Sequence, residues 1–337
     1  MTGIAIAGGG IIGLSIAWRL MRAGADVTVF DDGDEGAWHV AAGMLAAGGE
    51  SACETAELVR LLDRSAELWP GFAAELGADV GYDDTGTLSL AMTADDLAEA
   101  TRGWTRRRLP RLRPSELREL EPALSPRVRA GALDLQERQV DPRRVVAALR
   151  DRLGVRVVAK RIDALSDLDA STVVVAAGCG TAALTGLPVR PVKGQVLRLR
   201  GEPGLLRHVL DATVDGRDVY VVPRADGEVV VGATQEERTD RLVTAGAVHD
   251  LLRTAIDLVP ALAEFELTET CVGHRPGTPD NAPLLGHLDD RVVIAAGHHR
   301  NGVLLAPVTA DLIAGLVLTG DADPMLAAFS PRRFRCV

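Results

Sequence analysis

Residues 3–33 read GIAIAGGGIIGLSIAWRLMRAGADVTVFDDG, and this stretch decides the fold class. The β-rich segment IAIA leads into a cluster of glycines, and a helix is expected from about Ile11 until near Gly24. The apolar segment VTVF then ends at Asp31. A strand, a glycine turn, a helix and a second strand in this order predict a βαβ unit. We therefore expect an α/β fold with a parallel sheet and a phosphate site at the turn.

The glycines of this turn match the GxGxxG pattern of dinucleotide-binding proteins at Gly8, Gly10 and Gly13. Glycine allows the backbone to approach a pyrophosphate closely, and the N-terminus of the following helix supplies N–H donors and partial positive charge. Asp31, at the end of the second strand, is placed to accept hydrogen bonds from ribose hydroxyls. These residues predict dinucleotide binding and leave the identity of the dinucleotide open.

The composition of the chain limits its domains and partners. With 337 residues the chain exceeds the usual size of one hydrophobic core, so two domains are expected. Its 47 acidic and 37 basic side chains give a net charge of −10, which argues against a nucleic-acid partner. The arginine-rich stretch 106–113 alternates with acidic segments and is predicted to be a solvated helical face.

The cysteines and the first residues predict a cytoplasmic protein. The four cysteines are widely spaced and form no CxxC pair, so neither a zinc site nor a disulfide framework is expected; they are Cys53, Cys179, Cys271 and Cys336. The chain enters a strand almost at once, without a signal-peptide pattern, and no run reaches about 18 apolar residues. We expect reduced thiols and no membrane association.

The remaining elements indicate two interleaved domains. A helix at 54–76 and a helix after Asp141 as N-cap, from Pro142 to Gly154, are assigned to the dinucleotide-binding half, as are strands at 155–159, 172–178 and 291–297. Closely spaced strands between 193 and 234 are typical of an antiparallel sheet. The predicted division gives residues 1–78, 141–190 and 272–337 to the first domain, and residues 79–140 and 191–271 to the second.

Two further stretches are unusual. The stretch AAGHHRNGVLLAP, residues 295–307, concentrates hydrogen-bonding side chains before an apolar helix, which Asn301 or Gly302 is expected to cap and which runs to about Leu318. The stretch HVAAGMLAA, residues 39–47, surrounds Gly43 with small residues. Such a run lets the main chain lie against a flat ring system, but a tightly packed turn has the same pattern.

Eight motifs spread over nearly the whole chain resemble the D-amino-acid oxidase superfamily, and within it the bacterial glycine oxidases of the thiamine-pathway type. They are GGGIIG (8–13), AAGML (41–45), RELEPAL (118–124), VDP (140–142), VYVVPR (219–224), VGAT (231–234), GHRPGTPDNAPLLG (273–286) and AAGHHRNGVLLAP (295–307). The resemblance implies a Rossmann-type FAD-binding domain, similar to that of glutathione reductase, interleaved with an antiparallel-sheet substrate domain. It also implies FAD held without a covalent bond.

The resemblance implies FAD contacts throughout the first domain. At the start of the last helix, the N–H groups of Gly302, Val303 and Leu304 are expected to face the flavin, where negative charge gathers on reduction. The full set of expected cofactor contacts is Gly8, Gly10, Ile11, Ile12, Gly13, Asp31, Asp32, Ala37, Trp38, Ala42, Gly43, Met44, Ile162, Ala177, Gly178, His298, His299, Arg300, Asn301, Gly302, Val303 and Leu304.

The resemblance also implies a substrate site. Arg275, expected in a loop held by Pro276 and Gly277, would grip the α-carboxylate with two parallel hydrogen bonds; the alternative is a structural ion pair with an acid such as Asp280. Arg300 is expected to assist at the pocket mouth, and the Tyr220 hydroxyl to lie near the carboxylate, although either can serve only the fold. No metal site is expected at His298 and His299, because adjacent residues rarely converge on one ion.

The implied reaction is FAD-dependent oxidation of glycine or an N-substituted glycine, with hydride transfer from Cα to flavin N5. O₂ is reduced to H₂O₂, and the products are glyoxylate and ammonia or a primary amine. Two positions depart from the family pattern: Asp218 stands where histidine is expected, and Gln235 where methionine is usual. Both are expected to face the substrate and to admit a larger, polar amine substituent, such as that of an N-carboxymethyl β-amino acid.

Two other functions stay open at this point. One is a flavin dehydrogenase that passes electrons to a carrier, and the other is a catalytically silent dinucleotide-binding protein. The sequence leaves open the substituent on nitrogen, the pathway, whether thiamine or secondary metabolism, and whether the chain forms a homo-oligomer.

Overall fold

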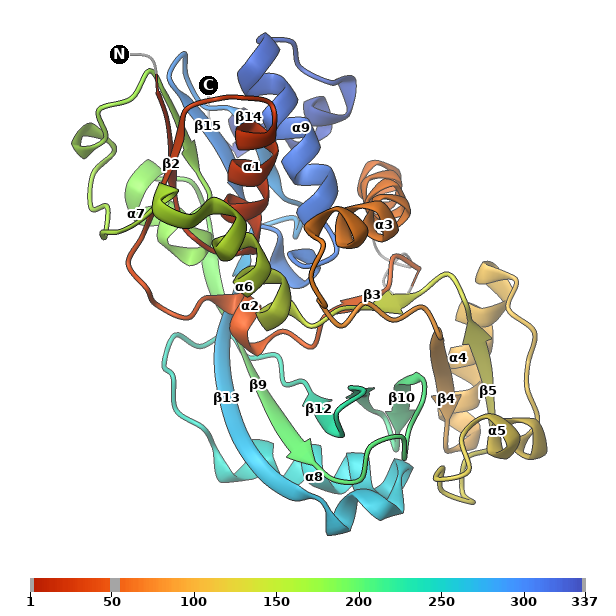
Figure 1. Ribbon diagram of the computed structural model, residues 1–337. Helices are drawn as coiled ribbons and strands as arrows, with labels where there is room; N and C mark the ends of the chain where they lie inside the picture. Colours follow the sequence, from red (N-terminus) through yellow and green to blue (C-terminus); the bar gives the residue numbers. More distant parts are fainter. Residues whose placement is uncertain (1–2, 49–54, 335–337) are drawn as a thin grey trace.

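The computed structural model describes residues 3–48 and 55–334, and its first sheet contains the predicted βαβ unit (Figure 1). Six strands run in the order β14-β15-β8-β1-β2-β7, and all pair in parallel except β14 with β15. The predicted return of 155–159 and 172–178 to this sheet is confirmed. The strands are β1 (Ile4–Ala7), β2 (Val27–Asp31), β7 (Val157–Ala159), β8 (Thr172–Val175), β14 (Leu284–His287) and β15 (Val292–Ala296).

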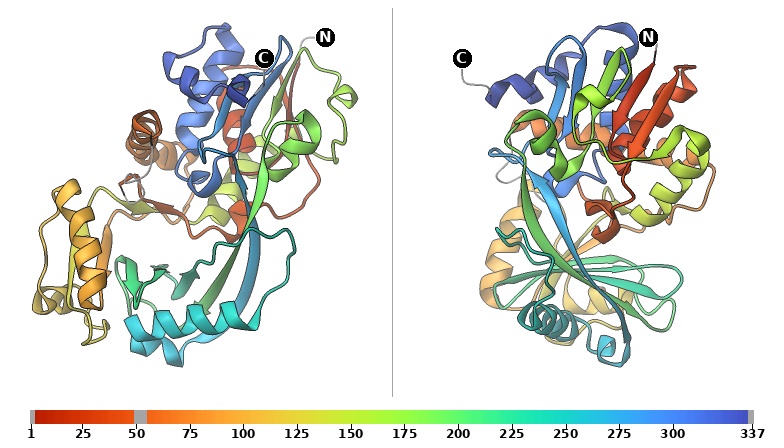
Figure 2. Two further views of the ribbon diagram at one scale, coloured as in Figure 1. Left: turned by 180° about the vertical axis from the view of Figure 1, so that it is seen from behind. Right: turned by 90° about the vertical axis from the view of Figure 1, so that its left-hand side faces the viewer.

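Helices cover both faces of this sheet (Figure 2). On one face α1 (Ile11–Arg22) packs against α6 (Pro142–Leu153) and α9 (Ala306–Thr319), and α3 (Ala56–Leu76) packs against α9. The short α7 (Thr181–Thr185) lies over the other face, where it joins a smaller apolar cluster. Side chains of α3 also fix the turn before α9, because Ser65 Oγ and Trp69 Nε1 both donate to the Leu304 carbonyl, at 2.6 and 2.9 Å.

The second sheet has seven strands in the order β13-β9-β12-β11-β10-β4-β5. The expected antiparallel arrangement holds for all neighbours except β10 and β4, which are parallel, so this sheet is mixed. The spacing of apolar residues along the chain could not reveal the parallel pairing of β10 with β4, because the two strands are distant in the sequence. The strands are β4 (Thr87–Ala91), β5 (Ala130–Asp134), β9 (Arg190–Arg200), β10 (Val209–Val214), β11 (Arg217–Pro223), β12 (Glu228–Gly232) and β13 (Glu266–Gly277).

The two halves are joined by long strands and by short crossing segments. Figure 2 shows β9 and β13 side by side, running from the half that holds the first sheet into the other. Because β13 extends to Gly277, it crosses the expected boundary at residue 272. A two-stranded sheet of β3 (Met44–Leu45) and β6 (Arg138–Gln139) lies between the halves. The division into domains stays a prediction.

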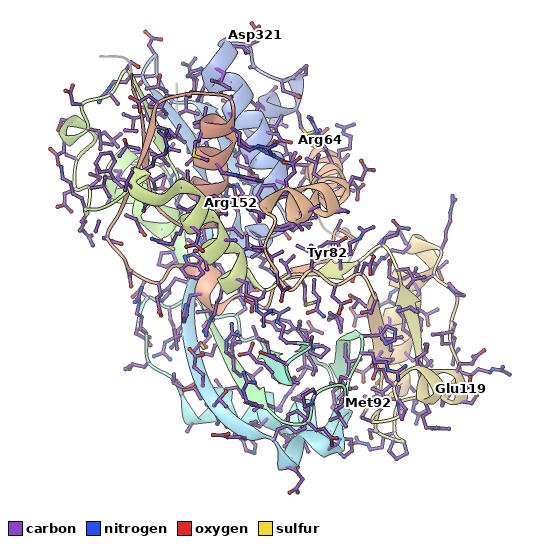
Figure 3. The ribbon with its side chains drawn as sticks, in the orientation of Figure 1. Arg64, Tyr82, Met92, Glu119, Arg152 and Asp321 are labelled. Carbon is purple, nitrogen blue, oxygen red and sulfur yellow. The ribbon has the colours of Figure 1, made fainter. Side chains whose placement is uncertain are left out.

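Three helices accompany the second sheet, and Figure 1 shows α8 across its outer face. In Figure 3, Met92 and Glu119 lie in this half, whereas Arg64, Arg152 and Asp321 lie in the other. The described chain has no single helix long and apolar enough to span a membrane; α9 and residues 324–334 meet that test only together, across a bend of 106°. The helices are α4 (Ala94–Arg107), α5 (Pro114–Leu120) and α8 (Ala245–Leu258), and α2 (Ala37–Val40) lies between the halves.

The predicted cap of α6 is confirmed. Asp141 precedes Pro142, the first helical residue, and its carboxylate accepts from the backbone N–H groups of Arg143 and Arg144, at 2.8 and 3.4 Å. Gly154 follows the last helical residue. Capping matters here because α6 carries Arg150, whose guanidinium contacts the Gly9 carbonyl at 3.1 Å and the Asp31 carboxylate.

Replacing Asp141 by alanine should lower the free energy of unfolding by about 1 kcal/mol, because two N–H groups lose their acceptor. Asp141→Asn keeps an acceptor and should cost less than half as much. Urea unfolding of the holoprotein measures both variants. Equal losses in the two variants would show that the cap contributes nothing at this position.

Candidate active site

A cavity of about 1600 Å³ lies between the two sheets. Its walls come from the glycine turn after β1, the segment around α2 and β3, the end of β8, the turn after β15, and one face of the second sheet. The site residues expected from the sequence line this cavity, with the exceptions of Gly13 and Leu304. The structure therefore brings the expected cofactor and substrate residues into one space.

In the glycine turn after β1, one glycine has free space beside it and the others are packed against the chain. A Cβ atom at Gly13 would lie 2.0 Å from the carbonyl oxygen of Gly8, and one at Gly9 would lie 2.5 Å from the Asp31 side chain. At Gly10, by contrast, the nearest atom would be Cδ1 of Trp38, at 3.5 Å. Gly13 and Gly9 are therefore required by the packing of the chain itself. Gly10 borders free cavity space, as the close approach of a pyrophosphate requires.

The two carboxylates after β2 already have partners. Asp31 is 9% exposed and forms an ion pair with Arg150. Asp32 is exposed and lies 3.4 Å from Arg161. Asp31 also borders the cavity, so an oxygen of its carboxylate can accept a second hydrogen bond. Its role toward a ribose stays a prediction.

The segment 39–47 is both a tight turn and a cavity wall. Gly43 has a φ of 81°, and a Cβ atom there would lie 1.9 Å from the Val140 carbonyl oxygen. This close approach explains the glycine without any ligand. Ala42, Gly43 and Met44 nevertheless line the cavity, so the main chain can also lie against a ring system.

The expected helix start at Gly302 is wrong. His299–Asn301 form a single 3₁₀ turn, and α9 begins only at Ala306. The physical reason is an irregular run of backbone hydrogen bonds before α9: Ala306 N donates to the carbonyl of Val303, only three residues back, and Pro307 has no N–H to donate. The donors are nevertheless available: in residues 3–48 and 55–334 no acceptor pairs with the N–H groups of Gly302, Val303 or Leu304. Gly302 and Val303 line the cavity, whereas Leu304 does not.

The two adjacent histidines have different surroundings. His298 is 3% exposed, its Nε2 lies 3.1 Å from Thr309 Oγ1, and burial lowers its pKa to about 3. Burial, followed by the charges of Arg275 and Arg300, lowers the pKa of His299 to about 4. Both imidazoles are therefore neutral at physiological pH. Within the described ranges no group of three or more His, Cys, Asp or Glu side chains could hold a metal ion.

Arg275 lies on β13, paired with Val192 of β9, and not in the expected loop. Residues Pro276 and Gly277 continue this strand, because β9 supplies a partner that the local sequence does not reveal. The guanidinium lines the cavity, and its Nη1 donates to the Thr234 carbonyl at 3.1 Å.

The surroundings of Arg275 also bear on the alternative pairing with Asp280. A Cβ atom at Gly194 would lie 2.6 Å from its guanidinium, so the glycine makes room for the arginine. The alternative partner Asp280 instead pairs with Arg333, at 2.9 Å.

Tyr220 lies beside these arginines on the cavity face of the second sheet. Burial raises its pKa, and the nearby charges of Arg275 and Arg300 act in the opposite direction. Asp218 and Gln235 line the cavity but are exposed, and the Asp218 carboxylate accepts from Thr213 Oγ1 at 2.9 Å. Burial therefore does not require either side chain to have a partner in the cavity, and their role toward a substrate stays a prediction.

Sequence reasoning missed the residues on the far side of the cavity. Ser89, Asp211 and Tyr220 stand directly opposite one another on β4, β10 and β11, so their side chains share one face of the sheet. Trp104 of α4 donates to Ser89 Oγ at 2.9 Å and closes this end. The only sequence signal was the alternation in 86–92, which identifies a strand but not its neighbours.

The arginine-rich stretch 106–113 is only partly solvated. Arg107 pairs with the buried carboxylates of Asp134 and Glu137, and its side chain is 16% exposed. Cys179 and Cys271, two of the four cysteines, are free thiols, and the other two lie outside the described residues.

Comparison with known proteins agrees with this geometry. Residues 3–316 match the family model described as FAD dependent oxidoreductase. The chain belongs to this family. It is an FAD-dependent oxidoreductase, and the open position at Gly10 and the unpaired N–H groups at 302–303 fit that cofactor.

Three individual relatives show which members of the family the chain resembles. The bifunctional protein ThiO/ThiG of Synechocystis sp. is 36% identical over 98% of this chain, which spans about half, 54%, of that relative. The crystal structure of glycine oxidase from Geobacillus kaustophilus is 32% identical, with a TM-score of 0.88 and 99% of each chain covered. Iminodiacetate oxidase from Chelativorans sp. is 27% identical, with a TM-score of 0.86 and coverage of 97% and 98%. The FAD-dependent oxidoreductase fold is therefore shared over the full length of the solved relatives.

Replacing Gly10 by leucine should abolish FAD retention while the protein still folds, because the side chain would enter cavity space rather than the packed chain. Gly71→Leu is the matched control, since no atom lies within 4 Å of a Cβ atom at Gly71 either. Flavin absorbance after gel filtration measures retention. A yellow Gly10→Leu protein would place the pyrophosphate elsewhere.

The lowered pKa of His298 predicts acid sensitivity. Its folded-state pKa of about 3 lies below the ordinary value of 6.5, so the folded state disfavours protonation, and stability is lost as the pH falls below 6.5. At about pH 5 the loss amounts to about 2 kcal/mol. His298→Asn removes one of two such titrations, because His299 also has a lowered pKa, and should roughly halve the pH dependence of urea unfolding between about pH 7.5 and about pH 5. The exposed residue His249 supplies the control variant, His249→Asn, which should keep the wild-type dependence.

Proposed function

We propose that this chain oxidises N-substituted glycines, and glycine itself less efficiently. The observation that carries the proposal is the position of Arg275 and Arg300 in the same cavity as the FAD-binding turn, with Tyr220 beside them. Two guanidinium groups and a phenolic hydroxyl are suited to an α-carboxylate, which fixes the orientation of the substrate as well as its affinity.

The chain's residues bind and orient the substrate. FAD, when bound, supplies the two-electron acceptor for oxidation of the amine. The secondary amine R–NH–CH₂–COO⁻, water and O₂ yield the primary amine R–NH₂, glyoxylate and H₂O₂. The positive charge for the carboxylate comes from Arg275 and Arg300, because His298 and His299 are neutral.

Space beside the carboxylate site supports a substituted amine. The row from Tyr220 through Asp211 to Ser89 crosses three neighbouring strands, which lie about 4.8 Å apart, so the cavity continues about 10 Å beyond Tyr220. Glycine leaves this space unused. The similarity to iminodiacetate oxidase, named for an N-substituted glycine, agrees with such a substrate. Asp218 and Gln235 add polar groups to the same walls and favour a substituent with a polar group.

The proposed reaction also defines the partners of the protein and where it acts. The small-molecule partners are the amine and O₂, and the reaction is assigned to the cytoplasm. The net charge of −10 supports the absence of a nucleic-acid partner. Transfer of electrons to a carrier, and binding without catalysis, are the two competing outcomes that the following experiment separates.

The test compares glycine, sarcosine and N-(4-hydroxybutyl)glycine in an oxygen electrode. Each buried methylene adds about 0.8 kcal/mol, and the terminal hydroxyl can pair with the polar walls, so N-(4-hydroxybutyl)glycine should exceed sarcosine in kcat/KM by at least about tenfold. Glycine exceeding both by tenfold would assign the chain to glycine. Anaerobic flavin bleaching without O₂ uptake would identify a dehydrogenase, and the absence of bleaching with every amine would identify a silent binding protein.

The carboxylate clamp is tested on the best substrate of that series. Arg275→Ala should lower kcat/KM by an amount on the order of 2 to 4 kcal/mol, mainly through KM, and Arg275→Lys should recover only part of it. Arg217, an exposed residue paired with Asp250, provides the control variant Arg217→Ala, which should behave as wild type. Normal turnover by Arg275→Ala would assign the anchor to Arg300.

A further inference from the structure

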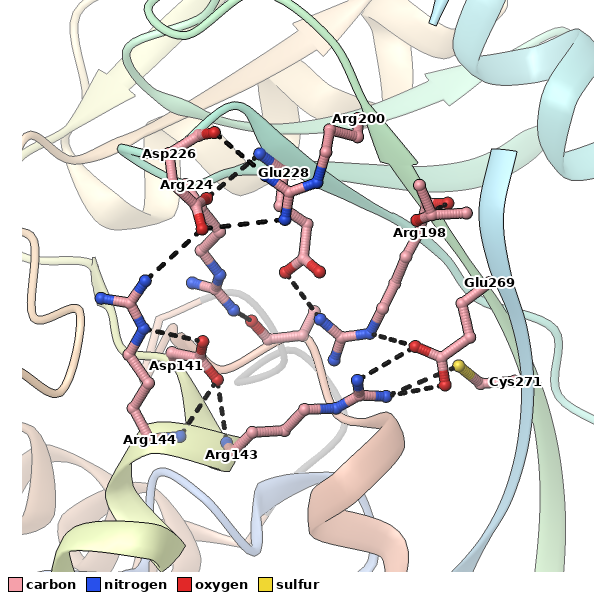
Figure 4. A network of polar contacts seen from close by, with 12 residues as sticks. Asp141, Arg143, Arg144, Arg198, Arg200, Arg224, Asp226, Glu228, Glu269 and Cys271 are labelled. Carbon is pink, nitrogen blue, oxygen red and sulfur yellow. Dashed lines mark hydrogen bonds and ion pairs between the residues drawn. The ribbon is translucent and has the colours of Figure 1, made fainter. Parts of the chain in front are cut away.

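Three arginines labelled in Figure 4, Arg143, Arg198 and Arg224, donate to backbone carbonyls of one segment beside the FAD cavity. Arg143 Nε and Arg198 Nη2 donate to the carbonyl of His39, at 2.8 and 3.3 Å. Arg224 Nη2 donates to the carbonyl of Ala42. These carbonyls belong to α2 and to the segment that follows it, whose residues line the cavity. The arginines come from α6, β9 and the end of β11, so both halves of the molecule hold this segment.

Arg224 connects two neighbouring segments of the chain at that wall. Besides the Ala42 carbonyl, its Nη1 donates to Gln139 Oε1 at 2.6 Å. The backbone of Gln139 pairs with Met44 in the β3–β6 sheet. A single guanidinium therefore connects the Ala42–Met44 segment to the strand that supports it.

The same segment cannot shift without breaking further contacts. The Gly43 carbonyl accepts from Val140 N at 3.0 Å, and a Cβ atom at Gly43 would collide with the Val140 carbonyl. The forked geometry of arginine, with two donors in one plane, matches two fixed acceptors in a way that a lysine ammonium does not. The position of the Ala42–Met44 backbone thus depends on Arg224.

Arg224 differs from the other two arginines in how its charge is balanced. Arg143 forms two 3.0 Å contacts with Glu269, and Arg198 lies 2.7 Å from Glu228. Arg224 is 9% exposed, and no carboxylate lies within ion-pair distance of it in residues 3–48 and 55–334. Its Nε also has no hydrogen-bond partner there.

A buried guanidinium without a carboxylate in contact is costly. Burial lowers the pKa of Arg224, but an arginine stays protonated at physiological pH. The charge therefore persists directly behind a wall of the cofactor cavity. Negative charge that develops inside the cavity is attracted to it, because a buried charge is screened less than an exposed one.

We propose that Arg224 is a positioning residue for FAD, which holds the Ala42–Met44 segment against the cofactor and whose buried charge favours reduction of the cofactor. The proposal rests on the FAD cofactor of the family and not on the amine substrate, so it can fail or succeed independently of the proposed function. Reduction adds negative charge to the flavin, so the nearby positive charge raises its midpoint potential.

The test uses holoprotein variants of Arg224 and two readouts other than turnover. Arg224→Met removes both the hydrogen bonds and the charge. It should raise the dissociation constant for FAD at least tenfold and shift the midpoint potential to more negative values. Arg224→Lys keeps the charge but not the fork. It should weaken FAD binding to a similar extent while the potential stays near the wild-type value.

A matched control removes a charge from the same network without touching the cavity wall. Arg200 is 47% exposed, lies 3.8 Å from Asp226 and makes no contact with the Ala42–Met44 segment. Arg200→Met should leave both the FAD affinity and the potential unchanged, because solvent screens its charge.

The outcomes show whether Arg224 positions the cofactor segment, whether its charge affects the flavin potential, or whether it does neither. An unchanged potential in Arg224→Met overturns the role of the charge, and unchanged FAD affinity in both Arg224 variants overturns the role in positioning. If Arg224→Met does not fold, Arg224→Gln replaces it, since an amide can keep one of the two hydrogen bonds while losing the charge; its potential must still shift. A shift of the same size in Arg200→Met would show that the effect is not specific to Arg224.

Discussion

The contact between the backbones of Gly8 and Gly13 is the constraint on which the site depends. Helix α1 starts so close to the end of β1 that a Cβ atom at Gly13 would lie 2.0 Å from the Gly8 carbonyl oxygen. On its other side Gly8 meets the carbonyl of Ala176, where a Cβ atom would lie 2.4 Å away. The ends of β1 and β8 and the start of α1 therefore meet without side chains between them. This contact leaves Gly10 facing the cavity, where the cofactor is proposed to bind.

The second half of the molecule fixes the substrate side by a similar chain of contacts. Lys193 is fully buried, and its Nζ binds the Asp240 carboxylate and the Leu242 carbonyl, both at 2.7 Å. Its backbone pairs in both directions with Glu236, so the segment after β12 is held against β9. That segment presents the Thr234 carbonyl, which accepts from Arg275. The buried charge of Lys193 is thus compensated by groups of the segment that also holds Arg275, the proposed anchor for the carboxylate.

The sequence predicted the features that depend on neighbours along the chain. The glycine turn, the Asp141 cap and all strands of the first sheet except β14 were predicted from local patterns, and the structure agrees with them. The features that the sequence did not reveal depend on distant partners. Arg275 is in a strand because β9 lies beside it, and the pairing of β10 with β4 joins segments more than a hundred residues apart.

The same distinction holds within the site. The motif at 295–307 identified the donors correctly, but α9 begins four residues beyond the expected Gly302, because Ala306 donates only three residues back and Pro307 has no N–H. The resemblance indicated which residues gather around the cavity but not how exposed they are, and Asp218 and Gln235 turned out to be exposed. Arg224 lay within a quoted motif without an assigned role, because a buried guanidinium can be recognised only once its acceptors at Ala42 and Gln139 are known.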